Sequence, residues 1–143
     1  MTVLDAFAVI ALLRGEPAAT KTRALLERGD AELTSTGLAE VVDHLVRLMG
    51  VDEEQAVLDI AQLGLDQPQD IDATTALAAG LLRARHYHRT GRAVSLADCI
   101  AAVSAQQRGT DLATSDPHLL ALCHDESIAY LALPDSHGVT WKP

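Results

Sequence analysis

The stretch VSLADCIAAVSAQQRGTDLATSD, residues 94–116, decides the predicted fold. Its first part has the apolar spacing of a helix, and a glycine turn and a short apolar strand follow. Asp98 lies near the start of the helix and Asp116 lies directly after the strand. In an open parallel α/β sheet, helix amino ends and strand carboxyl ends meet at the edge where ligands bind. The stretch therefore predicts a parallel sheet with both aspartates at one edge.

Two further acidic residues are expected at the same edge. Asp5 ends the first apolar run, MTVLD, and Glu40 lies in the first turns of the helix that follows the second apolar run. Thr114 adds a hydroxyl on the same side of the extended chain as Asp116. Carboxylates gathered without a counter-charge repel one another, so we expect a bound cation, and oxygen ligands suit Mg²⁺ or Mn²⁺. The candidate ligands are Asp5, Glu40, Asp98 and Asp116.

Each of these carboxylates also has a purely structural interpretation. An acid at a helix start bonds the free N–H groups and opposes the positive helix end. Asp5 could cap a helix, Asp116 could do so with Pro117 at the first helical position, and Asp98 could close a capping box with Ser95. Capping does not require an acid, because Ser, Thr and Asn serve as well. Several acids at one edge therefore favour a functional site over independent caps.

The alternation of strands and helices along the chain predicts the fold class. It implies βαβ units and an α/β fold, with a central, mainly parallel sheet of about four or five short strands flanked by about seven helices. Strands are expected over residues 2–4 and 32–34, after the glycine turn of the 94–116 stretch, and around 128–133. Helices are expected over 6–13, 18–27, 38–49, 53–63, 70–89 and 117–123, and in the first part of the 94–116 stretch. The helix over 70–89 is expected to pack through a small-residue face made of Ala73, Leu77, Gly80, Leu81 and Ala84.

Composition favours one compact unit. The chain has 143 residues and is 48% hydrophobic but only 3% aromatic, which suits Ala-faced helices packed closely on a small sheet. We expect a single domain, residues 1–143. Cys99 and Cys123 lie in apolar helical patterns without metal-binding spacing, so we expect buried free thiols. The amino terminus carries Asp5 and no basic region, and no uncharged run is long enough for a bilayer, so we expect a cytoplasmic protein without membrane contact.

The charged residues are unevenly distributed. A net charge of −9 argues against a protein that coats nucleic acid, because phosphate neutralisation needs Lys and Arg. Nevertheless, four of the eleven basic residues fall within ten positions, namely Arg83, Arg85, Arg89 and Arg92. They form either a solvated helix end that complements the helix dipole or a rim that binds RNA phosphates, and both interpretations stay open.

These segments together resemble the PIN-domain family, and within it the VapC-type toxins of prokaryotic toxin–antitoxin systems. The matching segments are VLDAFAVIALLRGEP around Asp5, LTSTGLAEVVDHLVR around Glu40, and the opening stretch with Asp98 and Asp116. They occur in the family's order and at suitable separations, so the likeness covers nearly the whole chain.

The resemblance implies a three-layer PIN-like fold and a metal-dependent endoribonuclease that acts as a toxin. The acidic cluster of such an enzyme holds one or two Mg²⁺ or Mn²⁺ ions, and a metal-activated water attacks an RNA phosphodiester. Asp5, Glu40 and Asp98 would be the core ligands, Asp116 a direct or water-mediated ligand, and Thr114 a supporting residue. The resemblance also implies a homodimer and a cognate antitoxin that covers the active site.

The chain departs from the commoner family pattern at two positions. Phe7 stands where a small hydroxyl residue is frequent, and Gly37 stands where a polar residue is frequent. An alternative from another functional class is a catalytically inactive PIN-like module that only binds a protein partner. A receiver domain is disfavoured because neither lysine, Lys21 nor Lys142, follows a late strand. A dehalogenase-type phosphatase would need an acid at position 7, and no GxSxG, Walker or GxGxxG motif occurs.

Overall fold

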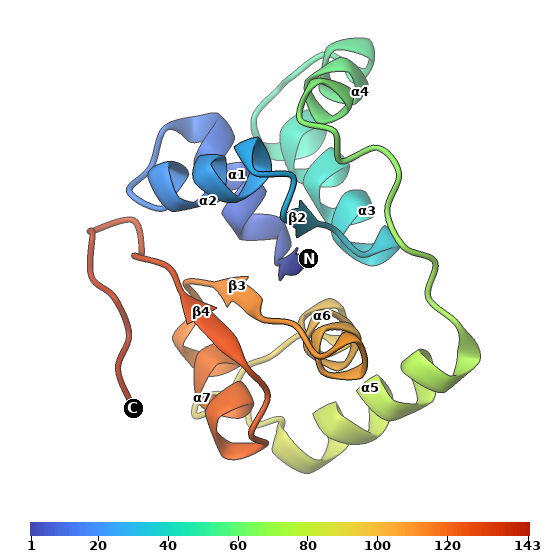
Figure 1. The fold of residues 1–143 in the computed structure, drawn as a ribbon, viewed down its shortest axis with the longest axis vertical. Helices are drawn as coiled ribbons and strands as arrows, with labels where there is room; N and C mark the ends of the chain where they lie inside the picture. The colour runs from blue at the N-terminus through green and yellow to red at the C-terminus, as the bar shows by residue number, and fades with distance from the viewer.

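Four short strands form one parallel sheet at the centre of the molecule (Figure 1). The computed structural model describes all residues, 1–143. The strands are β1 (Thr2–Leu4), β2 (Ala31–Glu32), β3 (Leu112–Thr114) and β4 (Tyr130–Ala132). Their order across the sheet is β2-β1-β3-β4, and every neighbouring pair is parallel. The predicted α/β fold with a parallel sheet is therefore confirmed.

Seven α-helices surround the sheet, as predicted. They are α1 (Ala6–Arg14), α2 (Ala19–Glu27), α3 (Ser35–Asp43), α4 (Glu53–Gln62), α5 (Ala73–His86), α6 (Leu96–Arg108) and α7 (Pro117–Asp125). None of them combines the length and the apolar character that crossing a lipid bilayer would require.

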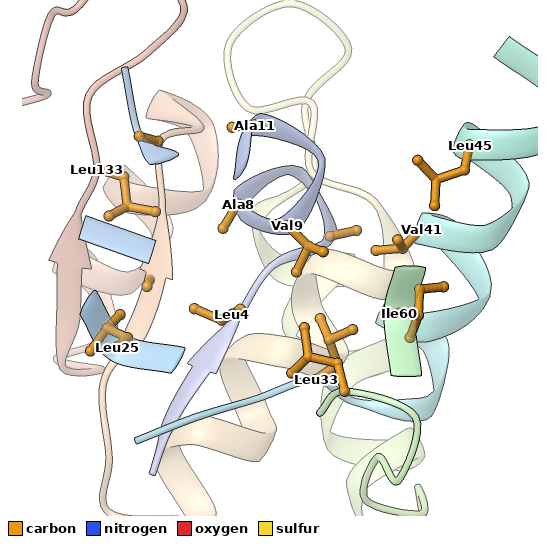
Figure 2. Close-up of a cluster of buried hydrophobic side chains, with 14 of the residues drawn as sticks. Leu4, Ala8, Val9, Ala11, Leu25, Leu33, Val41, Leu45, Ile60 and Leu133 are labelled. Carbon is orange, nitrogen blue, oxygen red and sulfur yellow. The ribbon is translucent and has the colours of Figure 1, made fainter. Parts of the chain in front are cut away.

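The sheet separates two hydrophobic cores, and this gives the three layers of the fold. Successive side chains of a strand point to opposite faces, so Val3 joins one core and Leu4 the other. Leu112 and Ala113 of β3 divide in the same way. In Figure 1, α1 to α4 cover one face, and α5, α6 and α7 cover the other. Figure 2 shows the first core, in which side chains of α1, α3 and α4 meet those of the sheet.

The helix expected to run to residue 49 changes its geometry after α3. Residues His44–Leu48 form one turn of π-helix, η1, in which the backbone N–H of Met49 donates to the carbonyl of His44 at 3.1 Å. The wider turn holds an extra residue and shifts the positions that follow it out of the helical register. Leu48, predicted to belong to the apolar stripe, is the last residue of this turn and is 59% exposed, whereas Leu45 before it is buried.

The predicted packing face of α5 is wrong. Leu77 and Leu81 are 66% and 56% exposed, while Thr75, Ala79 and Leu82 are buried against α6. Small apolar residues lie on several sides of this helix, so their spacing does not predict which side is buried. The buried side is the one that contacts α6. The face that packs includes a hydrogen bond from the hydroxyl of Thr75 to the side-chain oxygen of Gln107 at 2.8 Å.

Candidate active site

Asp5 is a buried carboxylate at the junction of β1 and α1. It is only 4% exposed. One oxygen, Oδ1, accepts a hydrogen bond from the backbone N–H of Ala8 at 2.8 Å and so caps α1. The other oxygen, Oδ2, accepts a hydrogen bond from the hydroxyl of Thr114 at the end of β3. The backbone N–H of Asp5 also donates to the carbonyl of Ala113 at 3.1 Å, so β3 fixes both its main chain and its side chain.

Burial raises the pKa of Asp5 to about 7. The hydrogen bonds from Thr114 and Ala8 lower this pKa, and the negative charges of Asp98 and Asp116 raise it. No lysine or arginine is among the groups that shift the pKa of Asp5. The ionised carboxylate therefore lies at a desolvated position without a positive partner, which is an environment that a bound cation would stabilise.

Asp98 is held at the amino end of α6 by the predicted capping box. Its Oδ2 accepts from the backbone N–H of Ser95 at 2.9 Å, and its own N–H donates to the hydroxyl oxygen of Ser95 at 3.0 Å. Burial raises the pKa of Asp98, the hydrogen bonds to Ser95 lower it, and the charge of Asp116 raises it. The structural role is confirmed, and it leaves the Oδ1 of Asp98 without a hydrogen bond inside the protein.

Asp116 follows β3 and caps α7, with Pro117 in the first turn as predicted. Its Oδ1 accepts from the backbone N–H of His118 at 2.8 Å. Its backbone N–H donates to the hydroxyl oxygen of Thr114 at 3.0 Å. Thr114 thus connects Asp116 to Asp5, because the same hydroxyl donates to one residue and accepts from the other.

Glu40 lies on α3, whose amino end is capped by Thr34. Its carboxyl is half-buried, and this burial, together with the charges of Asp98 and Asp43, raises its pKa. The interaction with Asp98 means that Glu40 faces the same edge. Gly37, on the turn before it, has little room for a side chain, since an added Cβ would lie 3.2 Å from the hydroxyl of Thr34.

The structure therefore brings four carboxyls from four separate segments to one edge of the sheet, where their charges repel. Their donors are all oxygen, which suits Mg²⁺ or Mn²⁺. However, no three Asp, Glu, His or Cys side chains are spaced closely enough to enclose a metal ion. The donor chemistry fits a divalent cation, and ligation requires the side chains to move toward one another. The ligand roles of the four residues remain a prediction.

Residues 2–124 match the family model of the PIN domain. The chain belongs to the PIN-domain family. This PIN domain is similar in structure to FitAcB from Neisseria gonorrhoeae, with a TM-score of 0.64, 20% sequence identity, and coverage of 92% of this chain and 96% of that chain. At such identity the likeness extends to the fold alone. A comparison with curated proteins gave no match.

Two further solved structures have similar folds. One is a toxin–antitoxin complex from Klebsiella pneumoniae, with a TM-score of 0.62, 19% identity, and coverage of 85% of this chain and 91% of that chain. The other is VapBC2 from Rickettsia felis bound to a DNA fragment from its promoter, with a TM-score of 0.62, 16% identity, and coverage of 91% and 96%.

A cleft of about 360 Å³ adjoins the carboxyl edge of the PIN domain. Asp116 belongs to its wall, as do Phe7 of α1, His44 of η1 and Asp135 of the carboxy-terminal segment. Phe7 is 52% exposed, and its ring meets the His44 ring edge-on, with 5.9 Å between centroids. Sequence reasoning missed His44 and Asp135, because only the fold brings them to this edge. The available signal was the large aromatic residue at position 7.

The four arginines of the cluster in the PIN domain make different contacts. The Nε of Arg83 donates to the carbonyl of Val94 at 2.9 Å, and its guanidinium lies 4.3 Å from the centre of the Tyr87 ring. Arg83 thereby connects the end of α5 to the segment that precedes α6, which is a structural role.

Two further arginines of the cluster form ion pairs, and one does not. Arg85 lies 3.6 Å from Glu126, and Arg92 lies 2.7 Å from Asp125. Arg89 is exposed and forms no ion pair. Much of the cluster thus stabilises the contact between the α5–α6 connection and α7, and Arg89 is the member whose charge is most available to an external phosphate.

Proposed function

We propose that this PIN domain is a metal-dependent endoribonuclease that acts as the toxin of a toxin–antitoxin pair. The observation that carries the proposal is the set of four carboxyls at one edge without a neighbouring lysine or arginine. The negative charges of Asp98 and Asp116 raise the pKa of Asp5, that of Asp98 raises the pKa of Glu40, and that of Asp116 raises the pKa of Asp98. PIN domains are typically nucleases that bind Mg²⁺. Repulsion among partly buried carboxylates destabilises the folded chain. Binding of a divalent ion would offset this repulsion and gives the cluster a function.

In this proposal, Asp5, Glu40 and Asp98 hold Mg²⁺ or Mn²⁺, and Asp116 holds it directly or through water. When bound, such an ion supplies a positive charge for the phosphate oxygens and lowers the pKa of water. The protein contributes carboxyls already gathered at one edge, and their side chains would move toward one another to bind the ion. The capping bonds of Asp98 and Asp116 each use one carboxylate oxygen and leave the other without an internal partner. The hydroxyl of Thr114 keeps the carboxylate of Asp5 in place beside them.

The structural relatives support a protein partner. One is a toxin–antitoxin complex, and another is a VapBC pair bound to promoter DNA. We therefore propose that a cognate antitoxin covers the carboxyl edge. We also propose that residues 1–143 form a single domain, and that the protein is a homodimer in the cytoplasm. The net charge of −9 favours a basic antitoxin segment. Size-exclusion chromatography with light scattering tests the homodimer, and co-purification with the product of a neighbouring short gene tests the antitoxin.

The decisive experiment is RNA cleavage by the purified chain in Mg²⁺, Mn²⁺ or EDTA. We expect cleavage by the wild type with either metal and none in EDTA. Asp98→Asn should remove cleavage and keep the fold, because an asparagine oxygen still accepts from the N–H of Ser95. Asp111→Asn is the matched control, since Asp111 is exposed and precedes β3, at the other end of the strand from the cluster. Full activity of Asp98→Asn would reject the site.

A second function, a PIN-domain module that binds a partner without cutting RNA, is favoured by two observations. The four carboxyls are not spaced to enclose a metal ion, and Asp5, Asp98 and Asp116 already cap helices. Calorimetry with Mn²⁺ separates the two functions. Binding that disappears in Asp98→Asn supports the nuclease, and a wild type that binds no Mn²⁺ supports the module.

A further inference from the structure

We propose that the cleft beside the carboxyl edge binds a purine base of single-stranded RNA, which stacks on Phe7 and donates its amino hydrogens to Asp135. This inference rests on the proposed ribonuclease function and gives that site a preference for one class of base.

The position of the cleft suits a nucleotide next to the cleaved bond. Asp116 belongs both to the carboxyl edge and to the wall of the cleft, so the two are continuous. The volume of about 360 Å³ lies within the roughly 300–1,000 Å³ of small-ligand sites. A strand whose phosphate lies at the carboxyls therefore has an adjacent space of the right size for one of its bases.

Phe7 supplies the stacking surface. It is the second residue of α1 and is 52% exposed, in a chain with very few aromatic residues. Its ring is 81° from the plane of the His44 ring, so the two rings form a T-shaped pair rather than a parallel stack. Recognition of single-stranded RNA commonly uses bases stacked on such aromatic side chains.

The charges in the cleft favour a neutral base over a phosphate. Its walls include the carboxylates of Glu16, Asp116 and Asp135. The only arginine in the cleft, Arg14, lies 3.3 Å from Glu16, so its charge is largely offset. A phosphate would be repelled by this set, whereas a base with amino groups offers hydrogens to the carboxylates.

Asp135 is the carboxylate prepared to accept those hydrogens. Its Oδ1 accepts from the backbone N–H groups of His137 and Val139, both at 2.9 Å, and fixes the turn. Its Oδ2 has no hydrogen bond within the protein. Adenine, guanine and cytosine carry an amino group, and uracil carries carbonyl oxygens in its place. Purines also offer the larger surface for stacking on Phe7, so they fit both features of the cleft.

The first test measures binding of fluorescent pentanucleotides UUAUU, UUGUU and UUUUU to the full chain in EDTA. Repulsion by the carboxyl edge acts on all three probes alike, so their relative affinities report the cleft. We expect the two purine probes to bind more tightly than UUUUU. Phe7→Leu should weaken the purine probes about tenfold, as loss of one stacked base does, and Phe7→Trp should retain their affinity. Leu77→Ala, an exposed apolar change on α5 across the sheet, is the matched control and should change nothing.

The second test changes the base preference through Asp135→Asn. The asparagine oxygen still accepts from His137 and Val139 and keeps the turn, while its NH₂ group replaces the free acceptor with a donor. Preference should shift from the purine probes toward UUUUU. Equal wild-type affinities for the three probes, or unchanged purine binding in Phe7→Leu, would overturn the inference. Since EDTA prevents metal-dependent cleavage, binding with this pattern in a chain that never cuts RNA would overturn the nuclease function and leave the base site standing.

Discussion

The hydroxyl of Thr114 donates a hydrogen bond to the buried carboxylate of Asp5, although 109 positions separate the two residues in the sequence. The same hydroxyl oxygen accepts from the backbone N–H of Asp116 at 3.0 Å. One side chain of β3 thus fixes the position of one carboxylate of the cluster and the main chain of another.

Thr114→Val should destabilise the protein and weaken metal binding. Valine has a similar shape and no hydroxyl, so Asp5 loses a buried donor and the N–H of Asp116 loses its acceptor. We expect the free energy of unfolding to fall by about 1–3 kcal/mol, the usual cost of unsatisfied buried polar groups. Urea denaturation at pH 8 measures it. Thr114→Ser keeps the hydroxyl and is the control, and equal losses in both variants would assign the effect to packing.

The stability of the metal-free protein should fall as pH rises from about 4 to about 7. The pKa of Asp5 is about 7 in the folded chain and near its ordinary 3.8 in the unfolded chain, so in this window the folded state binds the extra proton. Unfolding then releases a proton, and stability decreases with pH by up to about 4 kcal/mol before levelling off. Asp5→Asn removes this contribution, so the difference between the two pH profiles isolates Asp5.

Addition of a divalent ion should reverse that loss. At pH 8, Mg²⁺ or Mn²⁺ at about 100 times its dissociation constant should stabilise the wild type by about 2.7 kcal/mol. Thermal unfolding with and without EDTA measures the shift, and Asp98→Asn should show little of it. If neither ion changes the melting temperature of the wild type, the proposed metal site is contradicted.

Arg108→Met should be strongly destabilising although Arg108 lies at the opposite end of α6 from Asp98. The guanidinium of Arg108 in α6 pairs with the carboxylate of Glu32, which lies in β2 with only 10% of its side chain exposed. Removing the arginine leaves a buried charge unpaired, at a cost of about 3 kcal/mol. The double variant Arg108→Met, Glu32→Leu should recover most of this loss, and chemical denaturation of the three proteins tests the expectation.

Arg89→Ala should weaken RNA binding without affecting stability. Arg89 is exposed and unpaired, so its removal should lower the salt dependence of binding by about the contribution of one phosphate contact, roughly 0.7 in the log–log slope for a single strand. Arg85→Ala is the comparison, because Arg85 already pairs with Glu126. Binding isotherms over a range of salt measure the slopes. Identical slopes for wild type and Arg89→Ala would exclude Arg89 from the RNA contact.

The two cysteines should be inert in the native protein. Both are buried and free, and burial raises the pKa of Cys99 to about 11 and that of Cys123 to about 12. Since the thiolate is the reactive form, iodoacetamide at pH 8 should label neither residue in the folded chain and both in guanidinium. Mass spectrometry reads the labelling, and fast native modification would reveal opening of α6 or α7.

The sequence predicted those features that depend on local chemistry or on a parallel sheet. The capping box of Ser95 and Asp98 and the cap of Asp116 with Pro117 were predictable, because the residues that make them are close in sequence. The common edge of Asp5, Asp98 and Asp116 was predictable as well, because parallel strands all end on one side.

Other features depend on contacts that a linear pattern does not encode. The packed face of α5 was predicted wrongly because several of its faces carry small apolar residues. The π turn that begins at His44 had no sequence signal that we could use, and it changes which residues of the helix are buried. Asp135 joins the cleft only because the segment after β4 returns to α1, which is a tertiary contact.

The double use of Asp5, Asp98 and Asp116, as helix caps and as candidate ligands, has an evolutionary consequence. A descendant of this chain that lost its chemistry would still need an acceptor at the start of α1, α6 and α7 in order to fold. Selection for folding alone would then preserve acids, or short polar residues like them, at these places long after catalysis had gone. Aspartates retained at these positions in related proteins therefore indicate an intact fold rather than catalysis. Glu40 caps no helix, so its retention is the better indicator of an active enzyme.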